Sequence, residues 1–357
     1  MEKRTLSYDI LRIIAILGVI ISHSDEITTS VTNYVGGATW WMVVFIDTLF
    51  RISVPFFVLL SGALAFPKVV NSSYAQVWQR ILHRLLIPFV FWTAFYGWWQ
   101  WRWKGIAFTF ASFIDNLFFS PSGFLYFIVL VIGLYAISPC LKPFLTFSNK
   151  QKTRLVFCLF LAASLYSTLL YFLLDKSEPG FSLLLFLPYT NYYLFGYISQ
   201  NIKLKTKTAW GLLGIALVIV LLNSIFFYIT LKHFNSGQTI FWAKTSGYYF
   251  WNTFSLPIIA TTILFWLGLK QLLENLVIKV FIKNILAEIS KASYGMYLIH
   301  GAVITLVDHY GHMAIHLIKQ ALYFAYFKKI LMVFILSYIL AAILKRLPVA
   351  RLIVGEK

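Results

Sequence analysis

The chain has 357 residues, of which 60% are hydrophobic and only 12% are charged, and its formal net charge is +18. Its mean hydropathy is +0.79. Because about a quarter of the residues of a soluble protein are charged, this composition excludes a soluble globular protein. Apolar runs recur along the whole length, so we expect an all-α integral membrane protein with a single membrane domain, 1–357, and no appended soluble domain.

The apolar runs predict about ten transmembrane helices. The expected spans are 8–27, 40–66, 83–101, 124–141, 155–174, 181–200, 209–231, 248–269, 293–309 and 326–344. Most of the 30 Lys and Arg residues fall in loops on one side of this arrangement, together with the basic residues near both ends of the chain. Basic loops mark the cytoplasmic side, so both termini are expected to be cytoplasmic. Lys328 and Lys329 fit this pattern worst, because they lie at the outer end of the last span. We expect the excess charge to face anionic membrane lipids, and we expect no nucleic-acid partner.

The first span carries three ionisable residues, Asp9, Arg12 and His23. Such residues are costly at bilayer depth and usually face a partner or a water-filled cavity. Arg12 and His23 are about three helical turns apart, on nearly the same face and roughly 16 Å apart along the axis. A histidine can accept and return a proton, and an arginine suits a phosphate or a carboxylate. The pattern favours a base near the outer face and an anion-binding group near the inner face. The alternative is that both side chains merely reach the two interfaces.

The second span contains Arg51, about eleven residues from its start and too deep to reach an interface easily. Asp47, one turn earlier, is its nearest local counter-charge, and Pro55 is expected to free a backbone carbonyl and open the helix. The sequence leaves two interpretations of Arg51 open, a functional arginine and a purely structural ion pair with Asp47. At the start of the third span, Arg80 and Arg84 could hold a phosphorylated cytosolic ligand, although topology and anionic lipid explain them equally well.

Histidines also occur in and after the ninth span. His300 lies seven residues into that span, where a satisfied packing histidine is the more common reading. His309, His312 and His316 follow at spacings of three and four. No full set of acidic or cysteine ligands accompanies them, so we expect no metal site.

Several of these residues, with some others, follow one another in an order that is found in a known protein family. The residues concerned are Asp9, Arg12 and His23; Arg51 to Phe57 with Ser61 and Gly62; Arg84 and Pro88; Gly123 to Phe127 with Tyr135, Ser138 and Pro139; and Ser293 to His300. In this order they resemble the acyltransferase-3 family of bacterial ten-helix membrane O-acyltransferases. The chain looks most like the short members that acetylate the enterobacterial common antigen. The resemblance extends from the first span to the ninth.

The resemblance implies transfer of an acyl group, usually acetyl from acetyl-CoA, to a sugar hydroxyl of a surface polysaccharide or lipid-linked glycan at the bacterial inner membrane. It implies that His23 is the catalytic histidine, as general base or transient acyl carrier, and that Arg12 and Arg51 are essential. Arg84 matches a basic position suited to the CoA phosphates. Acyl-CoA is then a donor substrate, and no permanently bound cofactor is expected. The other expected substrate-binding residues are Asp9, Ser61, Tyr126 and His300.

One departure concerns the acceptor. Related sequences often have His-Leu-Trp-Phe before the fourth helix, where this chain has Phe124, Leu125, Tyr126 and Phe127. If that site contacts the acceptor, we expect a different acceptor. Two other classes of function stay open. A multi-pass transporter or exporter of a glycan or small anion would also have intramembrane charges and a broken helix. A catalytically silent scaffold for glycan assembly is the third class.

Overall fold

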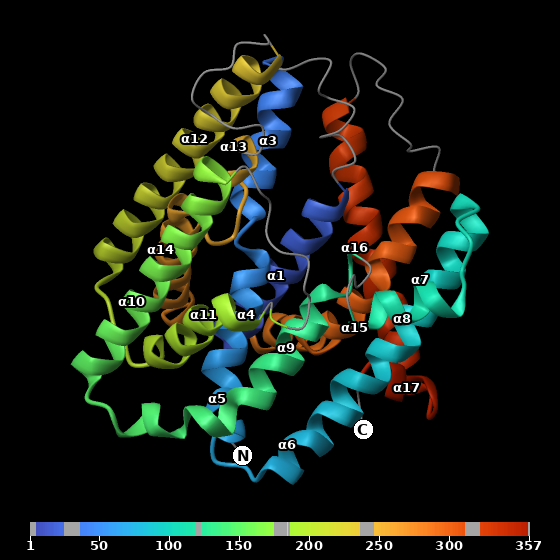
Figure 1. The fold of residues 1–357 in the computed structure, drawn as a ribbon, viewed down its shortest axis with the longest axis horizontal. Coiled ribbons are helices and arrows are strands. Elements are labelled where there is room, and N and C mark those ends of the chain that lie inside the picture. Colours follow the sequence, from blue (N-terminus) through green and yellow to red (C-terminus); the bar gives the residue numbers. More distant parts are fainter. Residues whose placement is uncertain are drawn as a thin grey trace.

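The computed structural model describes residues 5–24, 36–118, 123–174, 184, 186–235, 246–310 and 322–355. Within these ranges the protein is helical and contains no strand (Figure 1). The elements are α1 (Leu6–Ser24), α3 (Ala38–Phe50), α4 (Ser53–Leu64), α5 (Phe66–Val69), α6 (Tyr74–Ile81), η2 (Leu82–Leu86), α7 (Ile87–Lys104), α8 (Phe110–Phe118), α9 (Tyr126–Ile137), η3 (Ser138–Thr146), α10 (Asn149–Thr168), η4 (Leu169–Leu173), α11 (Phe186–Ser199), α12 (Thr206–Asn235), α13 (Ser246–Tyr249), α14 (Leu256–Glu274), α15 (Val280–Tyr310), α16 (Leu322–Arg346) and α17 (Ala350–Ile353).

Seven helical segments in the described ranges are long and apolar enough to cross a membrane. They are Leu6–Ser24, Trp40–Leu64, Tyr126–Thr146, Asn149–Leu173, Thr206–Lys232, Leu256–Glu274 and Phe324–Arg346. This result confirms an all-α integral membrane protein, while the count of ten spans and the side of the termini stay predictions. Residues 25–27 and 181–183, which the sequence assigned to spans, lie outside the described residues.

The other three expected spans coincide with α7, α11 and α15, which are helical but fall outside that set. Helix α11 has 14 residues, which corresponds to about 21 Å, shorter than the ~30 Å hydrocarbon core of a bilayer. Trp, Tyr and His side chains lower the hydropathy of α7 and α15 relative to aliphatic helices. Of these side chains, Tyr294, Tyr297 and His300 of α15 belong to the functional region described below.

Helix α1 lies in the middle of the bundle, with α3 and α4 on one side and α15 and α16 on the other (Figure 1). Its apolar side chains Leu11, Ala15, Ile16 and Ile20 are fully buried. Because α1 is surrounded by protein, its ionisable residues face other helices and need not reach lipid. This explains how a span can carry Asp9, Arg12 and His23.

Close helix contacts depend on small residues. A Cβ on Gly62 of α4 would run into the carbonyl of Tyr193 in α11, and one on Gly196 of α11 would run into the carbonyl of Leu59 in α4. Each glycine therefore lets the other helix approach backbone to backbone, as small residues do between membrane helices. The Ser61–Gly62 pair thus has a packing role besides any role in the site.

The second expected span is broken, as Pro55 predicts. Helix α3 ends at Phe50 and α4 begins at Ser53, so Arg51 and Ile52 form a turn between them. Pro55 has no N–H with which to bond the carbonyl of Arg51, four residues earlier. Irregular backbone at this depth is tolerated where protein surrounds it. The break places Arg51 between α3 and α4, where its side chain is 32% exposed.

Two lysines near the ends of expected spans, Lys329 and Lys270, are buried in the structure. Lys329 of α16 is 2% exposed, pairs with Asp308 of α15 at 2.7 Å, and donates to the carbonyl oxygen of Ser24 at 3.3 Å. Lys270 of α14 pairs with Glu274 at 3.1 Å and donates to two carbonyl oxygens just after α11. Both stabilise helix ends, which explains why Lys329 fits the loop pattern poorly.

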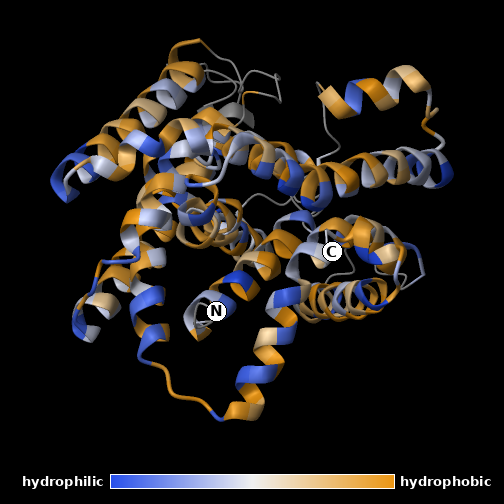
Figure 2. Cartoon of the chain, turned by 90° about the horizontal axis from the view of Figure 1, so that it is seen from below, coloured by the Kyte–Doolittle hydropathy of each residue, from blue (hydrophilic) through white to orange (hydrophobic). Residues whose placement is uncertain are grey.

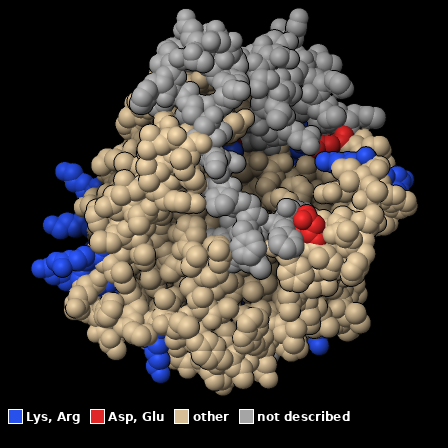
Figure 3. Space-filling view, viewed as in Figure 1, with Lys and Arg blue, Asp and Glu red and all other residues tan. Residues whose placement is uncertain are grey.

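The remaining surface is largely uncharged. Figure 2 shows hydrophobic residues over most of the bundle, with many of the hydrophilic ones towards helix ends. In Figure 3, Lys and Arg side chains gather at the left and lower edges, and most of the rest of that face carries no charge. Such a distribution suits a protein whose flanks contact lipid.

Candidate functional site

A cavity of about 680 Å³ lies between α1, α4, α9 and α15, with α5, α6, η2 and the end of α17 completing its wall. Four basic residues line it, Arg12, Lys68, Arg80 and Arg84, and no Asp or Glu of the described residues does. Several cations around one low-dielectric cavity create a positive potential that favours an anionic ligand. The cavity is large enough for a small-molecule substrate.

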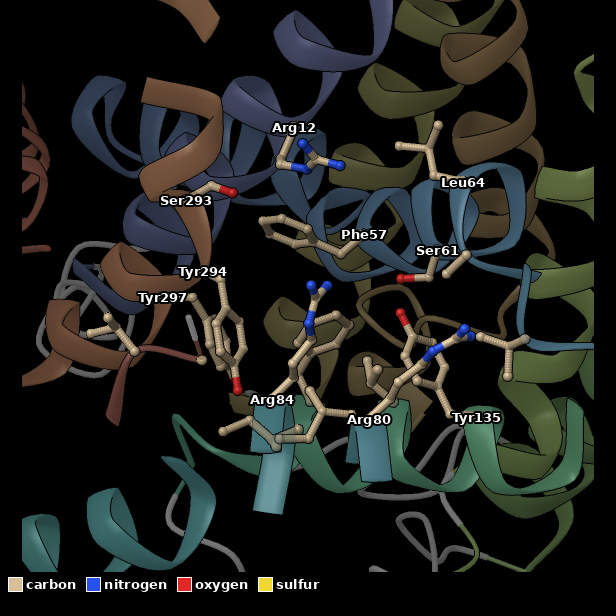
Figure 4. A pocket seen from close by; sticks show the side chains of 18 of the residues that line it. Arg12, Phe57, Ser61, Leu64, Arg80, Arg84, Tyr135, Ser293, Tyr294 and Tyr297 are labelled. Atoms are coloured by element: carbon tan, nitrogen blue, oxygen red, sulfur yellow. The ribbon is translucent and has the colours of Figure 1, made fainter. Parts of the chain in front are cut away.

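The local helix geometry directs Arg80 of α6 and Arg84 of η2 into the cavity. Helix α6 begins at a capping box formed by Ser73 and Gln76, which fixes its start. Arg80 and Arg84 are one turn apart and share a face. Figure 4 shows both guanidinium groups rising from these elements, with Arg12 on the opposite side of the cavity. Among the described residues neither Arg80 nor Arg84 has an ion-pair or hydrogen-bond partner, so both are available to an anion.

Arg12 is held by a network between α1 and α15. Its Nη1 donates to Ser290 Oγ at 3.0 Å, and Ser290 Oγ donates to Asp9 Oδ1 at 2.7 Å. The direct distance from Arg12 Nη1 to Asp9 Oδ1 is longer, 3.9 Å. Asp9 is 4% exposed and does not line the cavity. The structure therefore places Asp9 behind Arg12, where it fixes the orientation of the guanidinium group through Ser290.

Hydroxyl groups supply the other polar atoms of the cavity. The hydroxyl groups of Ser61 and Tyr135 face each other on the side of α4 and α9, while Ser293, Tyr294 and Tyr297 line the side of α15 (Figure 4). The hydroxyl of Tyr294 is buried and has no hydrogen-bond partner in the part of the chain that the structure describes. A ligand in the cavity would meet donors from both sides.

The end of the chain contributes to the cavity as well. Val354 and Gly355, just after α17, line it beside Arg84 and Tyr294. Gly355 has a φ of +72°, and a Cβ there would lie 2.8 Å from the Arg84 carbonyl oxygen. Only glycine fits this left-handed, crowded position. Nothing in the sequence pattern pointed to this segment as part of the site.

An aromatic wall, formed by Phe57, Phe127 and Tyr297, borders the cavity. The Phe57 and Phe127 ring centres are 5.5 Å apart, and those of Phe127 and Tyr297 are 5.4 Å apart. The three residues come from α4, α9 and α15, and all of them line the cavity. Behind the wall, the Tyr297 ring lies 5.8 Å from the ring of His300. The wall therefore separates the basic cavity from a second, histidine-containing layer.

The second layer contains a histidine pair, His23 of α1 and His300 of α15. Their ring centres are 5.3 Å apart. Phe124 contacts both, at 5.0 Å from His23 and 5.4 Å from His300. A Cβ on Gly301 would lie 2.8 Å from the Phe124 ring, so this glycine allows Phe124 to pack there. Phe124 occupies the first position of the segment in which the sequence departs from its resemblance.

Arg51 lies close enough to His23 for the two to interact electrostatically. Its Nη2 and Nε bond Asp47 Oδ2 at 2.6 and 3.1 Å, and its guanidinium group lies 4.8 Å from the centre of the Trp251 ring. The Asp47–Arg51 ion pair expected from the sequence is present, with Asp47 buried. Arg51 does not line the cavity. Its positive charge therefore acts on the histidine layer.

The expected site residues divide between the two layers. Arg12, Ser61 and Arg84 line the cavity, and His23 and His300 form the pair behind the wall. Asp9 and Arg51 support these groups from the side, and Tyr126, at the start of α9, does not line the cavity. Sequence reasoning missed Ser290 and Lys68, although Ser290 lies on the same helix face as Ser293 and His300.

No group of three or more His, Cys, Asp or Glu side chains in the described ranges could hold a metal ion. Of the three histidines after the ninth span, His309 packs on Trp103 with ring centres 4.7 Å apart. His312 and His316 lie outside the described residues.

Comparison with known proteins gives one match. A family model described as an acyltransferase domain matches residues 5–346, which is nearly the whole chain and includes all of the site above except Val354 and Gly355. No curated protein and no solved structure matches the chain.

Proposed function

The chain belongs to this acyltransferase family, and we propose that it transfers an acyl group, acetyl in the first instance, from cytosolic acyl-CoA to a sugar hydroxyl. The acceptor is a cell-surface polysaccharide or lipid-linked glycan, and the protein is a multi-pass protein of a bacterial inner membrane. Acyl-CoA is a substrate, and no resident cofactor takes part. The basic cavity ahead of the histidine pair is the observation that carries this proposal.

The cavity suits the phosphate end of acyl-CoA. Arginine binds phosphate through two parallel N–H···O bonds, and such charge-assisted bonds are about twice as strong as neutral ones. Arg80 and Arg84 each offer such a pair of N–H donors, and Arg12 offers a third pair on the opposite side of the cavity. The thin acyl end would pass the aromatic wall towards the histidine pair while the phosphates stay with the arginines.

The histidine layer suits the chemistry of transfer. His23 takes the proton from the sugar hydroxyl, whose oxygen attacks the thioester carbonyl; the C–S bond breaks and the proton passes to the leaving thiolate. Arg51, next to His23, stabilises the oxyanion that forms at the carbonyl. Transient acylation of His23 is the other route to the same product. An acyl-protein trapped in the wild type and absent from His23→Ala would support that second route.

The test is acyl transfer by membranes that contain the protein, supplied with acetyl-CoA labelled in the acetyl group and with a glycan-lipid fraction from the host. We expect thioester loss with label on a sugar in the wild type, and no transfer in His23→Ala. Arg84→Gln should raise KM for acetyl-CoA about tenfold, as expected for the loss of one charged contact of about 1.4 kcal/mol. Arg154→Gln is the matched control, because Arg154 is an exposed arginine of α10 that does not line the cavity.

Other results would point elsewhere. A glycan or small anion that crosses the membrane without thioester loss would indicate a transporter. A glycan phenotype that survives His23→Ala without any acyl transfer would indicate a scaffold. An Arg84→Gln variant with the KM of Arg154→Gln would remove the cavity as the CoA site.

A further inference from the structure

His300 is fixed in one tautomer by its own helix. Its Nδ1 lies 2.6 Å from the carbonyl oxygen of Tyr297, one turn earlier in α15. A carbonyl oxygen only accepts hydrogen bonds, so Nδ1 of the neutral ring must carry the hydrogen. The other nitrogen, Nε2, therefore has a lone pair and acts as an acceptor.

That acceptor is buried and lacks a donor. His300 is fully buried, and Nε2 has no hydrogen-bond partner in the described part of the chain. Buried polar atoms of native proteins are nearly always paired, so an exception calls for an explanation. The nearby hydroxyl of Tyr96 is already used, because it donates to the carbonyl oxygen of Leu298 at 2.8 Å. Phe124, which contacts both histidines, has no polar atom to offer.

Two of the rings that pack on His300 carry further polar atoms, those of His23 and Tyr297, and His23 is the nearer, with ring centres 5.3 Å away against 5.8 Å for Tyr297. An imidazole nitrogen lies about 1.2 Å from its ring centre, so an N–H···N bond of about 2.9 Å corresponds to ring centres a little over 5 Å apart. The observed separation is 5.3 Å, with the planes inclined by 39°. The spacing of the two helices therefore fits a hydrogen bond from a protonated nitrogen of His23 to Nε2 of His300 once the rings are turned towards each other.

We propose that His300 is a positioning residue for His23. Its Nε2 accepts a hydrogen bond from one ring nitrogen of His23, which leaves the other nitrogen of His23 as the acceptor for the substrate proton. This inference rests on the proposed function and deepens it. In this arrangement the buried acceptor, His300, holds the base, His23, in the tautomer that the reaction needs. When His23 takes the hydroxyl proton, its second N–H stays bonded to His300, and the proton then leaves with the thiolate.

The kinetic test compares two substitutions at one position. In His300→Gln the amide oxygen can take the place of Nε2 as an acceptor, whereas His300→Met has similar bulk and no strong acceptor. We expect His300→Met to lower kcat about 100-fold with an unchanged KM for acyl-CoA, in line with the loss of other orienting partners. His300→Gln should stay within about tenfold of the wild type. His309→Gln, outside both layers, is the control and should match the wild type.

The second readout does not need turnover. The protein has seven histidines, and ring-nitrogen NMR of ¹⁵N-histidine-labelled protein, assigned with single variants, reports the tautomer of each. We expect Nδ1 of His300 to be protonated, and we expect the tautomer of His23 to change in His300→Met but not in His300→Gln. An unchanged His23 tautomer in His300→Met would overturn the proposal. Equal losses of kcat in both variants, with KM raised in both, would also overturn it, because they would indicate a packing defect. Absence of acyl transfer in the wild type would refute the proposed function, while the NMR result would still decide whether the histidines are paired.

Discussion

The buried lysine of α16 gives a prediction that tests the packing around the histidine pair. Lys329→Met keeps the length of the side chain and removes its charge. The substitution breaks the pair with Asp308 at 2.7 Å and the bond to the carbonyl oxygen of Ser24 at 3.3 Å. Ser24 is the last residue of α1, next to His23, so the lost bond leaves a carbonyl at a helix end without its donor.

The expected cost of Lys329→Met is about 3 kcal/mol in the free energy of unfolding. Removal of one partner of a buried ion pair typically costs about 3–5 kcal/mol, because the other charge stays buried and unpaired. The lower end applies because the side chain of Asp308 is 19% exposed and keeps some solvation. Replacing both residues, in Lys329→Met with Asp308→Leu, should recover most of the loss, since no unpaired charge remains.

The assay is unfolding of the purified protein in mixed micelles, followed as a function of the denaturing detergent. The adjacent Lys328 is exposed, so Lys328→Met is a matched control with the same chemical change one residue away. We expect it to change the free energy of unfolding by less than about 0.5 kcal/mol, as surface substitutions usually do. Equal stability of Lys328→Met and Lys329→Met, or a double variant weaker than Lys329→Met, would refute the reasoning.

Three further predictions follow from single contacts. Ser290→Ala removes the bridge from Asp9 to Arg12 and should raise KM for acyl-CoA about tenfold, through the loss of about 1.5 kcal/mol of charge-assisted bonding. Ser224 is a buried serine that bonds within its own helix, so Ser224→Ala should leave this KM unchanged. Gly196→Ala forces α4 and α11 apart and should cost about 1–3 kcal/mol in unfolding experiments, whereas Gly211→Ala, with open space around it, should be neutral or stabilising. Arg51→Lys loses the two-nitrogen contact with Asp47 and should lower kcat by about tenfold or more; full activity would exclude a role for the guanidinium group.

The sequence predicted the fold class because composition and apolar run length depend on the bilayer alone. It also predicted a separation of about three helical turns between Arg12 and His23, and in the structure Arg12 lines the cavity while His23 lies in the histidine pair. Asp9 lies three residues before Arg12, a spacing that favours a pair between them, but the contact of Asp9 with Ser290, 281 residues away in the chain, is shorter than its contact with Arg12. A serine on a closely packed helix can approach at 2.7 Å, and no local spacing rule reveals that contact.

The aromatic wall could not be predicted from the sequence for a similar reason. Phe57, Phe127 and Tyr297 are ordinary apolar positions in three separate helices, and only the packed bundle brings their rings together. Lys329 shows the opposite error: its charge suggested a loop, but its partner Asp308 lies on another helix. Charge patterns indicate topology only where the charge is solvated, and packing decides that.

The order of the two layers has a chemical consequence. A thioester is vulnerable to water, and an acyltransferase must favour a sugar hydroxyl over solvent as the attacking group. The cavity is polar and carries several cations, so water can fill it. The histidine pair lies behind the wall among Phe124, Tyr297 and buried helix surface. A group that comes from the cavity passes Tyr297 of the wall before it meets the histidine pair. Under the proposed function, in which the CoA phosphates stay in the cavity, the wall would therefore shield the acyl group from the water there until an acceptor arrives.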